Sequence, residues 1–430
     1  MPTGRAVRRR CAPLFDFRSQ EVCVTPSALR FAISRTSKRP HFIANGRGFT
    51  VNSTEFHDQE FDQSTLLKLQ FFRGYIRKWL PVFLANRQPV FSEIHIYDFF
   101  CGPGTDPCGT EGSPLVILDE IDKLLREKAS VCRADVKVFV HFNDQNSDKV
   151  HALQSLVSKL PLKANCTIIF THFEFSEAFE KALPTLYEPC TANLLSVDQF
   201  GWKAISGRVF EAIIACPSTD LLFFISSSFV RRFSGDPSVT KYLPVQGDEL
   251  AAVPGKEVHR FLCDRVYRPL IPAKKEYYLA PFSIRKDGTS NIYGLIFGSG
   301  KLLGLKKFLE VCWASDQISG EANYDIDDDI VLRSGEYPLL PEDKVAKKRD
   351  RFEKELRSFL GGACKTNRDV FKFTLESGFL PKDSTEIITG LQKFGLLKVE
   401  YIQTSKAAGR NTFYIDWKYY REEPRVRFIC

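Results

Sequence analysis

The residues best placed to do chemistry are four acids and a glycine turn, each of which follows a hydrophobic run. The first run, Ile94–Tyr97, leads into Asp98 and then into Gly102-Pro-Gly104. This pattern predicts a strand that ends in a tight loop, where backbone N–H groups are open to a ligand. Because ligands bind outside the carboxyl ends of strands in open parallel sheets, we expect a cofactor at this turn. A turn built for packing alone, in which Pro103 offers no N–H, is the alternative.

Two further acids follow the next predicted strands. Asp144 comes after residues 136–142, and Glu174 comes after residues 166–171. An acid after the second strand typically accepts hydrogen bonds from ribose hydroxyls, and Glu174 could accept from an adenine amino group. The pattern predicts a site for S-adenosylmethionine with these cofactor-binding residues: Asp98, Gly102, Gly104, Asp144 and Glu174. The alternatives are that Asp144 caps a helix beginning at Ser147 and that Glu174 is an exposed loop acid.

The fourth hydrophobic run ends in Val197-Asp-Gln-Phe-Gly-Trp202. Enzymes that methylate exocyclic amino groups carry an Asp/Asn-Pro-Pro-aromatic motif here, whose oxygens accept from the amino group while the ring stacks on the base. The predicted catalytic residues are therefore Asp198, Phe200 and Trp202, with a nucleic acid as the acceptor, and a base in duplex DNA would have to be flipped out. The alternative is an ordinary turn that places Trp202 in the core.

Other chemistries fit the sequence less well. A cytosine-C5 methyltransferase needs a Pro-Cys nucleophile after the fourth run, whereas Cys216-Pro217 has the reverse order and a different position. We therefore expect no thiolate nucleophile at Cys216. His141 and His172 lack ligand partners at helical spacing, so no metal site is predicted.

The elements that must position these residues alternate between strand and helix. A helix is predicted from Ser64 on, because apolar residues recur there at helical spacing. Strands are predicted at 94–100, 136–142, 166–171, 193–197 and 221–225, with helices at 114–128, 147–159 and 175–183. This alternation is typical of a parallel sheet, so the predicted fold class is α/β, a Rossmann-like class I methyltransferase sheet. Two later strands, 276–280 and 291–297, would fit an antiparallel addition to it, and a helix at 302–313 follows them.

The C-terminal part has a different pattern. Helices are predicted at 351–360, 366–377 and 382–394, followed by a hairpin of strands 396–402 and 412–417. Three helices with a β wing are typical of a winged helix-turn-helix. The predicted nucleic-acid-binding residues are Lys365, Arg368, Lys382 and Lys393. Asp383 and Glu386 on the third helix would weaken base recognition, and docking of a protein is an equally open role.

Charge is spread unevenly over the 430 residues, whose net charge is +8. Residues 1–50 carry ten Lys or Arg against two acids, and residues 331–430 carry 20 against 14. We predict a flexible basic extension at 1–55, a methyltransferase-type domain at 56–320, a linker at 321–345 and a winged-helix domain with a tail at 346–430. The Arg-rich start is also compatible with an organelle transit peptide.

The twelve cysteines contain no C-x-x-C pair, which favours reduced thiols in a cytoplasmic protein. No apolar run reaches about 18 residues, so no membrane span is expected.

These motifs resemble those of the three-Cys-motif partner proteins, a bacterial family. The resemblance extends from about Ser64 to Trp417 and rests on these segments: Thr65-Leu-Leu-Lys68, Tyr97–Gly104, Gly112-Ser-Pro-Leu115, Asp198–Trp202, Gly294–Trp313 and residues 366–381. It implies a methyltransferase-like α/β domain, a C-terminal winged helix and a partner protein with a three-cysteine motif. Cys101 and Gln199 depart from the Ala and Pro that relatives usually carry there.

Two functions remain open at this point. One is an S-adenosylmethionine-dependent methyltransferase that acts on nucleic acid. The other is a non-catalytic protein of the same fold that binds a three-cysteine-motif protein, DNA or RNA.

Overall fold

The computed structural model describes residues 60–85, 91–130, 132–133, 135–161, 166–198, 204–243, 245, 247–327, 347–402 and 413–429. The predicted extension at 1–55 and most of the predicted linker lie outside these residues. The chain from Asn52 to Cys430 forms one compact unit. The predicted boundary between two domains within this unit stays a prediction.

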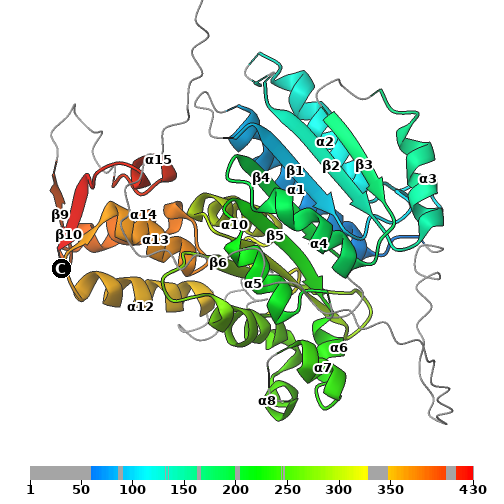
Figure 1. The fold of residues 1–430 in the computed structure, drawn as a ribbon. Coiled ribbons are helices and arrows are strands. Elements are labelled where there is room, and N and C mark those ends of the chain that lie inside the picture. The colour runs from blue at the N-terminus through cyan, green and yellow to red at the C-terminus, as the bar shows by residue number, and fades with distance from the viewer. Residues whose placement is uncertain are drawn as a thin grey trace, which may run out of the picture. The chain divides into compact units, whose positions relative to one another are not determined.

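A seven-stranded sheet organises the unit, with strand order β3-β2-β1-β4-β5-β7-β6 (Figure 1). Its strands are β1 Glu93–Asp98, β2 Lys137–Asn143, β3 Cys166–Thr171, β4 Thr191–Val197, β5 Thr219–Ile225, β6 Tyr278–Arg285 and β7 Ile292–Ser299. Neighbours from β3 to β5 pair in parallel, and β7 is antiparallel to both β5 and β6. The predicted mostly parallel α/β sheet with a late antiparallel strand is therefore confirmed.

Helices cover both faces of the sheet because alternate side chains of each strand point to opposite faces. On one face, Ile94 and Ile96 of β1 share a core with the helices α1, α2, α3 and α10. On the other face, Tyr97 and Phe99 share a second core with α4, α5 and the helices that follow β5. The bounds are α1 Gln63–Leu84, α2 Ser113–Glu127, α3 Ser147–Val157, α4 Phe175–Leu186, α5 Gly207–Ala215 and α10 Leu302–Ser315.

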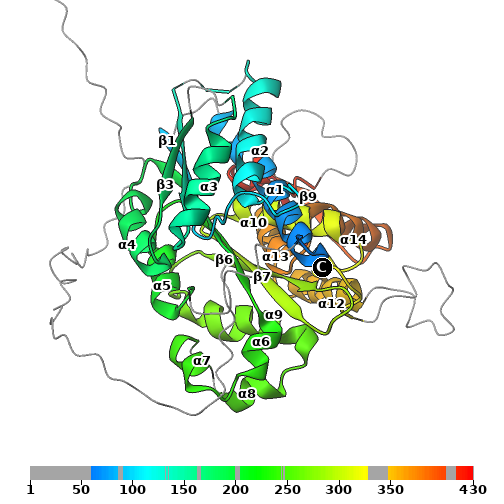
Figure 2. The same cartoon turned by 90° about the vertical axis from the view of Figure 1, so that its right-hand side faces the viewer.

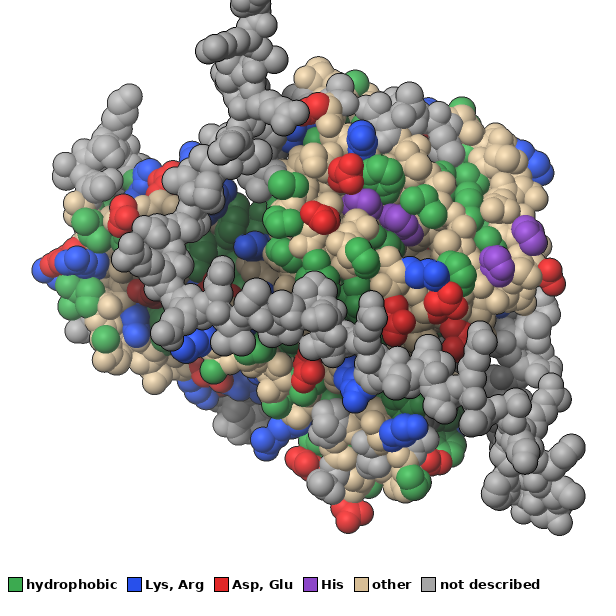
Figure 3. All heavy atoms as spheres, viewed as in Figure 1, with side chains coloured by type: hydrophobic (Ala, Val, Ile, Leu, Met, Phe, Trp, Pro, Cys, Tyr) green, Lys and Arg blue, Asp and Glu red, His purple; other side chains and the backbone are tan. Residues whose placement is uncertain are grey.

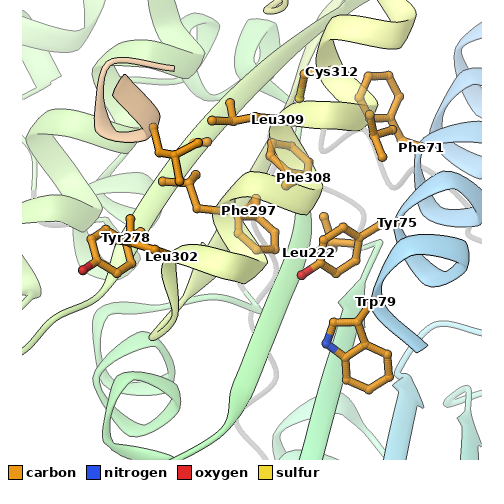
Figure 4. Close-up of a cluster of buried hydrophobic side chains, with 14 of the residues drawn as sticks. Phe71, Tyr75, Trp79, Leu222, Tyr278, Phe297, Leu302, Phe308, Leu309 and Cys312 are labelled. Carbon is orange, nitrogen blue, oxygen red and sulfur yellow. The ribbon is translucent and has the colours of Figure 1, made fainter. Parts of the chain in front are cut away.

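Large aromatic side chains fill the first core where α1 and α10 meet the sheet (Figure 4). Phe297 of β7 stacks on Phe308 of α10, with ring centroids 4.7 Å apart. Tyr75 of α1 packs against both rings, at 5.1 and 6.4 Å. The Tyr75 hydroxyl donates to Asp220 at 2.7 Å, which satisfies a polar group in an otherwise apolar layer.

Between β5 and β6 the chain forms a series of short helices, which the sequence analysis did not predict. They are α6 Ser227–Arg232, α7 Pro237–Tyr242, α8 Gly247–Ala252, α9 Val258–Phe261 and the turns that end at Leu270. Pieces of four to six residues contain too few turns to show a helical period. Their buried residues, among them Val258 and Leu262, close the second core below the sheet.

The C-terminal subregion, residues 347–429, contains three main helices and a small antiparallel sheet of order β8-β10-β9. Its elements are α12 Lys347–Gly361, β8 Lys365–Thr366, α13 Asn367–Glu376, α14 Pro381–Lys393, β9 Lys398–Tyr401, α15 Trp417–Tyr420 and β10 Val426–Ile429. The predicted hairpin partner was wrong: β9 pairs with β10, and the described residues 413–417 form no strand. The winged-helix assignment itself stays a prediction.

This subregion packs directly against the large sheet's helices, with α10 between α1 and α13 (Figure 2). Trp313 of α10 donates its indole N–H to the carbonyl of Gly378 at 3.0 Å. Lys348 of α12 donates to Ser319 O at 2.8 Å and pairs with the buried Glu321 at 3.1 Å. A buried charge is tolerated when it is paired in this way. One continuous core therefore joins the two parts of the chain.

None of the described helices is both long and apolar enough to cross a membrane. All nine cysteines in the described part of the chain are free thiols.

The continuous core that includes α1, α10 and the C-terminal helices can be tested by truncating Phe308. Phe308 is 1% exposed, so Phe308→Ala should lower the free energy of unfolding in urea by about 3–5 kcal/mol. Phe394, which is 76% exposed, is the matched control, and Phe394→Ala should change the same quantity by less than about 0.5 kcal/mol. Equal effects of the two substitutions would contradict the packing described here.

Candidate functional site

The sheet register brings the predicted acids to one edge. Asp98, the last residue of β1, aligns with Phe142 of β2 and with Ser196 of β4. Asp144 and Asp198 each lie two residues beyond those partners, at the carboxyl ends of parallel strands. The strand order changes direction between β1 and β4, which is where ligands bind in open α/β sheets. Asp98 and Asp198 therefore flank the expected ligand position.

The turn after β1 adopts the backbone that only glycine accommodates easily. Gly102 and Gly104 have φ angles of 60° and 96°. A Cβ atom at Gly104 would lie 2.7 Å from the Cδ1 atom of Leu153. The turn is closed by the N–H of Gly112, which donates to Gly104 O at 2.8 Å just before α2 begins. The backbone conformation therefore favours glycine at both positions, and the contact with Leu153 requires it at Gly104. The helix α2 starts with its N-terminus beside the turn.

Asp144 is joined to this turn by a direct hydrogen bond. Its Oδ2 atom accepts from the N–H of Gly102 at 3.2 Å, and its Oδ1 atom accepts from Asn146 N at 2.9 Å. The helix α3 is capped by Asn146, whose side chain accepts from Asp148 N and Lys149 N. Asp144 is therefore not the cap of α3, and its buried carboxylate lies against the predicted cofactor turn.

Asp98 is a buried acid with a strongly raised pKa. Its side chain is 1% exposed, and burial raises its pKa to about 7, with the charges of Asp198 and Asp144 adding to the rise and the nearby Ser113 hydroxyl and Phe100 N–H opposing it. Its Oδ1 atom accepts from Phe100 N at 3.3 Å. Its Oδ2 atom is buried and has no hydrogen-bond partner among the described residues. A buried acceptor left in this state is ready for a donor from a ligand.

Asp198 has a partner that the sequence analysis did not predict. The ammonium group of Lys68, in the second turn of α1, donates to Asp198 Oδ1 at 2.8 Å. The Asp198 side chain is 40% exposed, whereas that of Lys68 is 15% exposed. A signal was present in the sequence, because Lys68 lies four residues from both Ser64 and Phe72 on the buried face of α1. A charged residue on an apolar stripe is unusual.

The remaining predicted residues fall into two groups. Glu174 is exposed at the N-cap of α4, three residues beyond the end of β3 at the same edge of the sheet. Phe200 and Trp202 lie outside the described residues, as do Gln199 and Gly201 between β4 and α5.

Thiol and imidazole groups in the described part of the chain offer no competing site. Burial raises the pKa of Cys216 to about 11, and Cys216 precedes β5 at the end of the sheet away from Asp198. His141 accepts or donates a 3.0 Å hydrogen bond with His95, and burial lowers its pKa to about 3, with His95 contributing. No group of three or more His, Cys, Asp or Glu within the described ranges could hold a metal ion.

The predicted nucleic-acid residues are spread over the C-terminal subregion. Lys382 and Lys393 are exposed at the two ends of α14. Lys365 and Arg368 are half-buried, and their cationic groups lie 4.4 Å from the Phe359 ring centroid and 5.6 Å from the Tyr420 centroid.

The acids expected to oppose base recognition on α14 are both engaged within the protein. Asp383 is buried and accepts from Leu380 N at 2.9 Å. Glu386 pairs with Arg349 of α12 at 2.5 Å. Asp383 is therefore turned into the protein, whereas the exposed Glu386 shares its charge with Arg349.

The chain matches no family model and no curated protein. One similar solved structure is a putative caffeoyl-CoA O-methyltransferase from Staphylococcus aureus, with 13% identity, coverage of 54% of this chain and 82% of that chain, and a TM-score of 0.27. A second is the O-methyltransferase TomG from Streptomyces achromogenes in complex with SAM, with 12% identity, coverage of 56% of this chain and 90% of that chain, and a TM-score of 0.28. A third is spermidine synthase from Thermotoga maritima, with 10% identity, coverage of 64% of this chain and 72% of that chain, and a TM-score of 0.27. Scores of this size assign neither fold nor activity, so the strand order and register of this chain carry the fold assignment.

A pair of glycine substitutions tests the turn. Gly104→Ala and Gly109→Ala both place a side chain at a positive φ angle, but a Cβ atom at Gly109 would meet no atom within 4 Å. Because the backbone strain is shared and only Gly104 clashes with Leu153, Gly104→Ala should lower the free energy of unfolding by about 2 kcal/mol more than Gly109→Ala. Chemical denaturation measures both, and equal losses would show that the turn does not pack on α3.

Proposed function

We propose that this protein is an S-adenosylmethionine-dependent methyltransferase that acts on an amino group of a nucleic acid. The observation that carries the proposal is the buried, unpartnered Oδ2 atom of Asp98 beside a glycine turn that Asp144 also contacts. The strand order, with an antiparallel β7 between β5 and β6, is the one expected of a class I methyltransferase sheet. The fold alone supports no activity, so the argument rests on the edge residues.

The residues at the edge fit the parts of this cofactor. Asp98 would accept from the ammonium group of the methionine part, which the Gly102–Gly104 turn would approach closely. Asp144 keeps free lone pairs for ribose hydroxyls, because each of its oxygens accepts one hydrogen bond from the protein. Glu174 would face the adenine amino group. When bound, the cofactor supplies an activated methyl group, and the protein contributes orientation and exclusion of water.

Asp198 is the acid proposed to orient the acceptor. It follows β4 at the switch point, and its negative charge is close enough to contribute to the raised pKa of Asp98. An acceptor amino group that replaces the Lys68 ammonium group at Asp198 Oδ1 leaves that ammonium group without its acidic partner. A phosphate group of the substrate would offer Lys68 an alternative partner, which favours a polyanionic acceptor.

The C-terminal subregion is the proposed nucleic-acid contact. Figure 3 shows acidic and basic side chains interspersed over the visible face, without a broad field of one sign. On this face, binding would therefore depend on a local cluster of cations. Lys382 and Lys393 at the ends of α14 are the exposed cations of the predicted set.

A second candidate is a non-catalytic protein that binds a three-cysteine-motif protein. One observation favours it: four large apolar side chains in the segment from just after α14 to just after β9 are exposed. They are Phe394 (76%), Leu396 (57%), Tyr401 (45%) and Ile402 (41%). Such a patch is typical of protein contacts rather than of nucleic-acid contacts.

Calorimetric titration with S-adenosylmethionine tests the cofactor site. Asp144→Ala should weaken binding by about 10- to 100-fold, since it removes hydrogen bonds to a charged acceptor. Asp148→Ala, which removes an exposed acid from the first turn of α3, is the matched control and should bind as the wild type does. Absence of binding to the wild type, or equal affinities of the two variants, would refute the site.

The pH dependence of the same titration tests the role of Asp98. Its pKa of about 7 in the free protein means that Asp98 is mostly protonated at pH 6. An ammonium partner favours the carboxylate, so binding releases a proton, and affinity should rise roughly tenfold between pH 6 and pH 7.5. Asp98→Asn should abolish this rise. A wild-type affinity that is flat or falls over this range would remove Asp98 from the site.

Gel-shift titration of the full chain at several salt concentrations tests the acceptor class. Lys382→Ala/Lys393→Ala should weaken binding to DNA or RNA and reduce the slope of log affinity against log salt by about 2. Lys128→Ala/Lys159→Ala removes the same charge from exposed positions near the ends of α2 and α3 and should change neither quantity. If both double variants behave alike, docking of a protein becomes the better account of this subregion.

A further inference from the structure

Lys68 is held more tightly than an ordinary surface lysine. It lies on α1 and reaches over the carboxyl edge of the sheet to Asp198, where its Nζ atom is 2.8 Å from Oδ1. Its side chain is 15% exposed, although lysine is almost never buried without a specific partner. The proposed contacts of the cofactor do not involve this lysine.

Two aromatic rings also lie close to this ammonium group. Its Nζ atom lies 4.7 Å from the ring centroid of Phe224 and 5.0 Å from that of Tyr293. The rings belong to β5 and β7, which are paired neighbours, with Ile225 opposite Gly294. Both distances are within the range of a cation–π interaction, so the group has an acid on one side and two ring faces around it.

This acid-and-ring arrangement, Asp198 with Phe224 and Tyr293, is hereafter the ammonium cage. Cages of this kind recognise methylated ammonium groups, because aromatic faces attract a cation whose charge is spread over methyl groups. In this protein the cage stands where the methyl acceptor of the proposed reaction would stand. The occupant of the cage is a side chain of the chain itself.

We propose that Lys68 is a methyl acceptor in cis: the protein methylates the Lys68 amino group, which the ammonium cage holds at the acceptor position. The proposal rests on the proposed function for its methyl donor, S-adenosylmethionine. It adds a modification site on this chain and gives the Thr65-Leu-Leu-Lys68 segment the role of supplying the methyl acceptor. An acceptor in trans uses the same position after Lys68 has left Asp198.

The transfer balances with the groups at hand. Asp198 takes one proton from the Lys68 ammonium group across their hydrogen bond, which leaves a lone pair on Nζ. That lone pair forms the N–C bond to the methyl carbon while the S–C bond breaks, and its electron pair stays on sulfur. The products are N-methyl-lysine, which is already a cation when the N–C bond has formed, S-adenosylhomocysteine and one proton, which passes from Asp198 to water and restores the carboxylate.

The product would remain in the cage. Methylation keeps the positive charge of lysine, so the ion pair with Asp198 and both ring contacts persist. The modification should therefore stop at one lysine per chain. It should also compete with acceptors in trans, because the methylated side chain still occupies Asp198.

Lys181 provides a matched comparison on the same protein. It also lies 4.7 Å from one ring centroid, that of Phe173, and pairs with Glu177 at 3.5 Å. Its side chain is 56% exposed and extends from α4. Lys181 therefore has a neighbouring ring and a neighbouring acid but does not lie at the proposed methyl-acceptor position. If S-adenosylmethionine methylated accessible lysines non-specifically, Lys181 would be modified at least as readily as Lys68.

Peptide mass spectrometry of the full chain, incubated with methyl-labelled S-adenosylmethionine, is the first test. The expected result is one labelled methyl group at Lys68, none at Lys181, and loss of the label in Lys68→Arg and in Asp198→Asn but not in Lys181→Arg. Calorimetric binding of the cofactor without a label at Lys68 would overturn this proposal while the proposed function stands. Absence of cofactor binding would instead overturn the proposed function, and this proposal with it.

A second test needs no cofactor and no turnover. Lys68→Ala removes the side chain that fills the cage, and n-butylammonium has the same four-carbon stem and ammonium group. Calorimetric titration should show binding of n-butylammonium to Lys68→Ala and none to the wild type, with binding lost when Asp198→Asn is added. If n-butylammonium does not bind to a folded Lys68→Ala protein, as judged by its urea unfolding curve, the cage does not exist.

Discussion

Three strand ends of the large sheet are joined by one buried amide, the side chain of Asn143. Its Nδ2 atom donates to Phe99 O at 3.3 Å and to Phe173 O at 3.0 Å. Its Oδ1 atom accepts from Phe173 N at 3.0 Å and from the Thr171 hydroxyl at 2.9 Å. All four hydrogen bonds lie where β1, β2 and β3 end. Since the amide can make no further bonds of this strength, its geometry fixes the separation of the three loops.

The site depends on this constraint in a direct way. The carbonyl of Asn143 also accepts from Cys101 N at 2.9 Å, which holds the start of the glycine turn against β2. The next residue along the chain is Asp144, which reaches back to Gly102. The turn and the acid are therefore positioned by neighbouring atoms of a single strand end. A site placed on such a rigid support needs little rearrangement to receive a ligand.

Much of the large sheet could be predicted because its central strands β1, β4 and β5 are buried on both faces and read as continuous hydrophobic runs. The strand at 166–171 has the predicted bounds, and β1, β2 and β4 differ from the prediction by at most two residues at either end. The acids at the strand ends followed from the same register. What could not be predicted depends on contacts between distant segments: the pairing of β9 with β10, and the meeting of Lys68 with Asp198 across 130 residues of sequence. Local periodicity carries no information about either.

The continuous core has a consequence for how such a protein can change over evolutionary time. The C-terminal helices are held against α10 by the hydrogen bond of Trp313 and by the ion pair between Lys348 and Glu321. In the same core the rings of Phe352 and Phe379 stack with their centroids 4.0 Å apart. A C-terminal segment held in this way cannot be replaced as a unit by an unrelated domain, because any replacement would have to reproduce the surface that packs against α10. New binding preferences would therefore arise by drift of the outward residues of α14 and β9, while the inward ones stay under the selection that acts on the sheet.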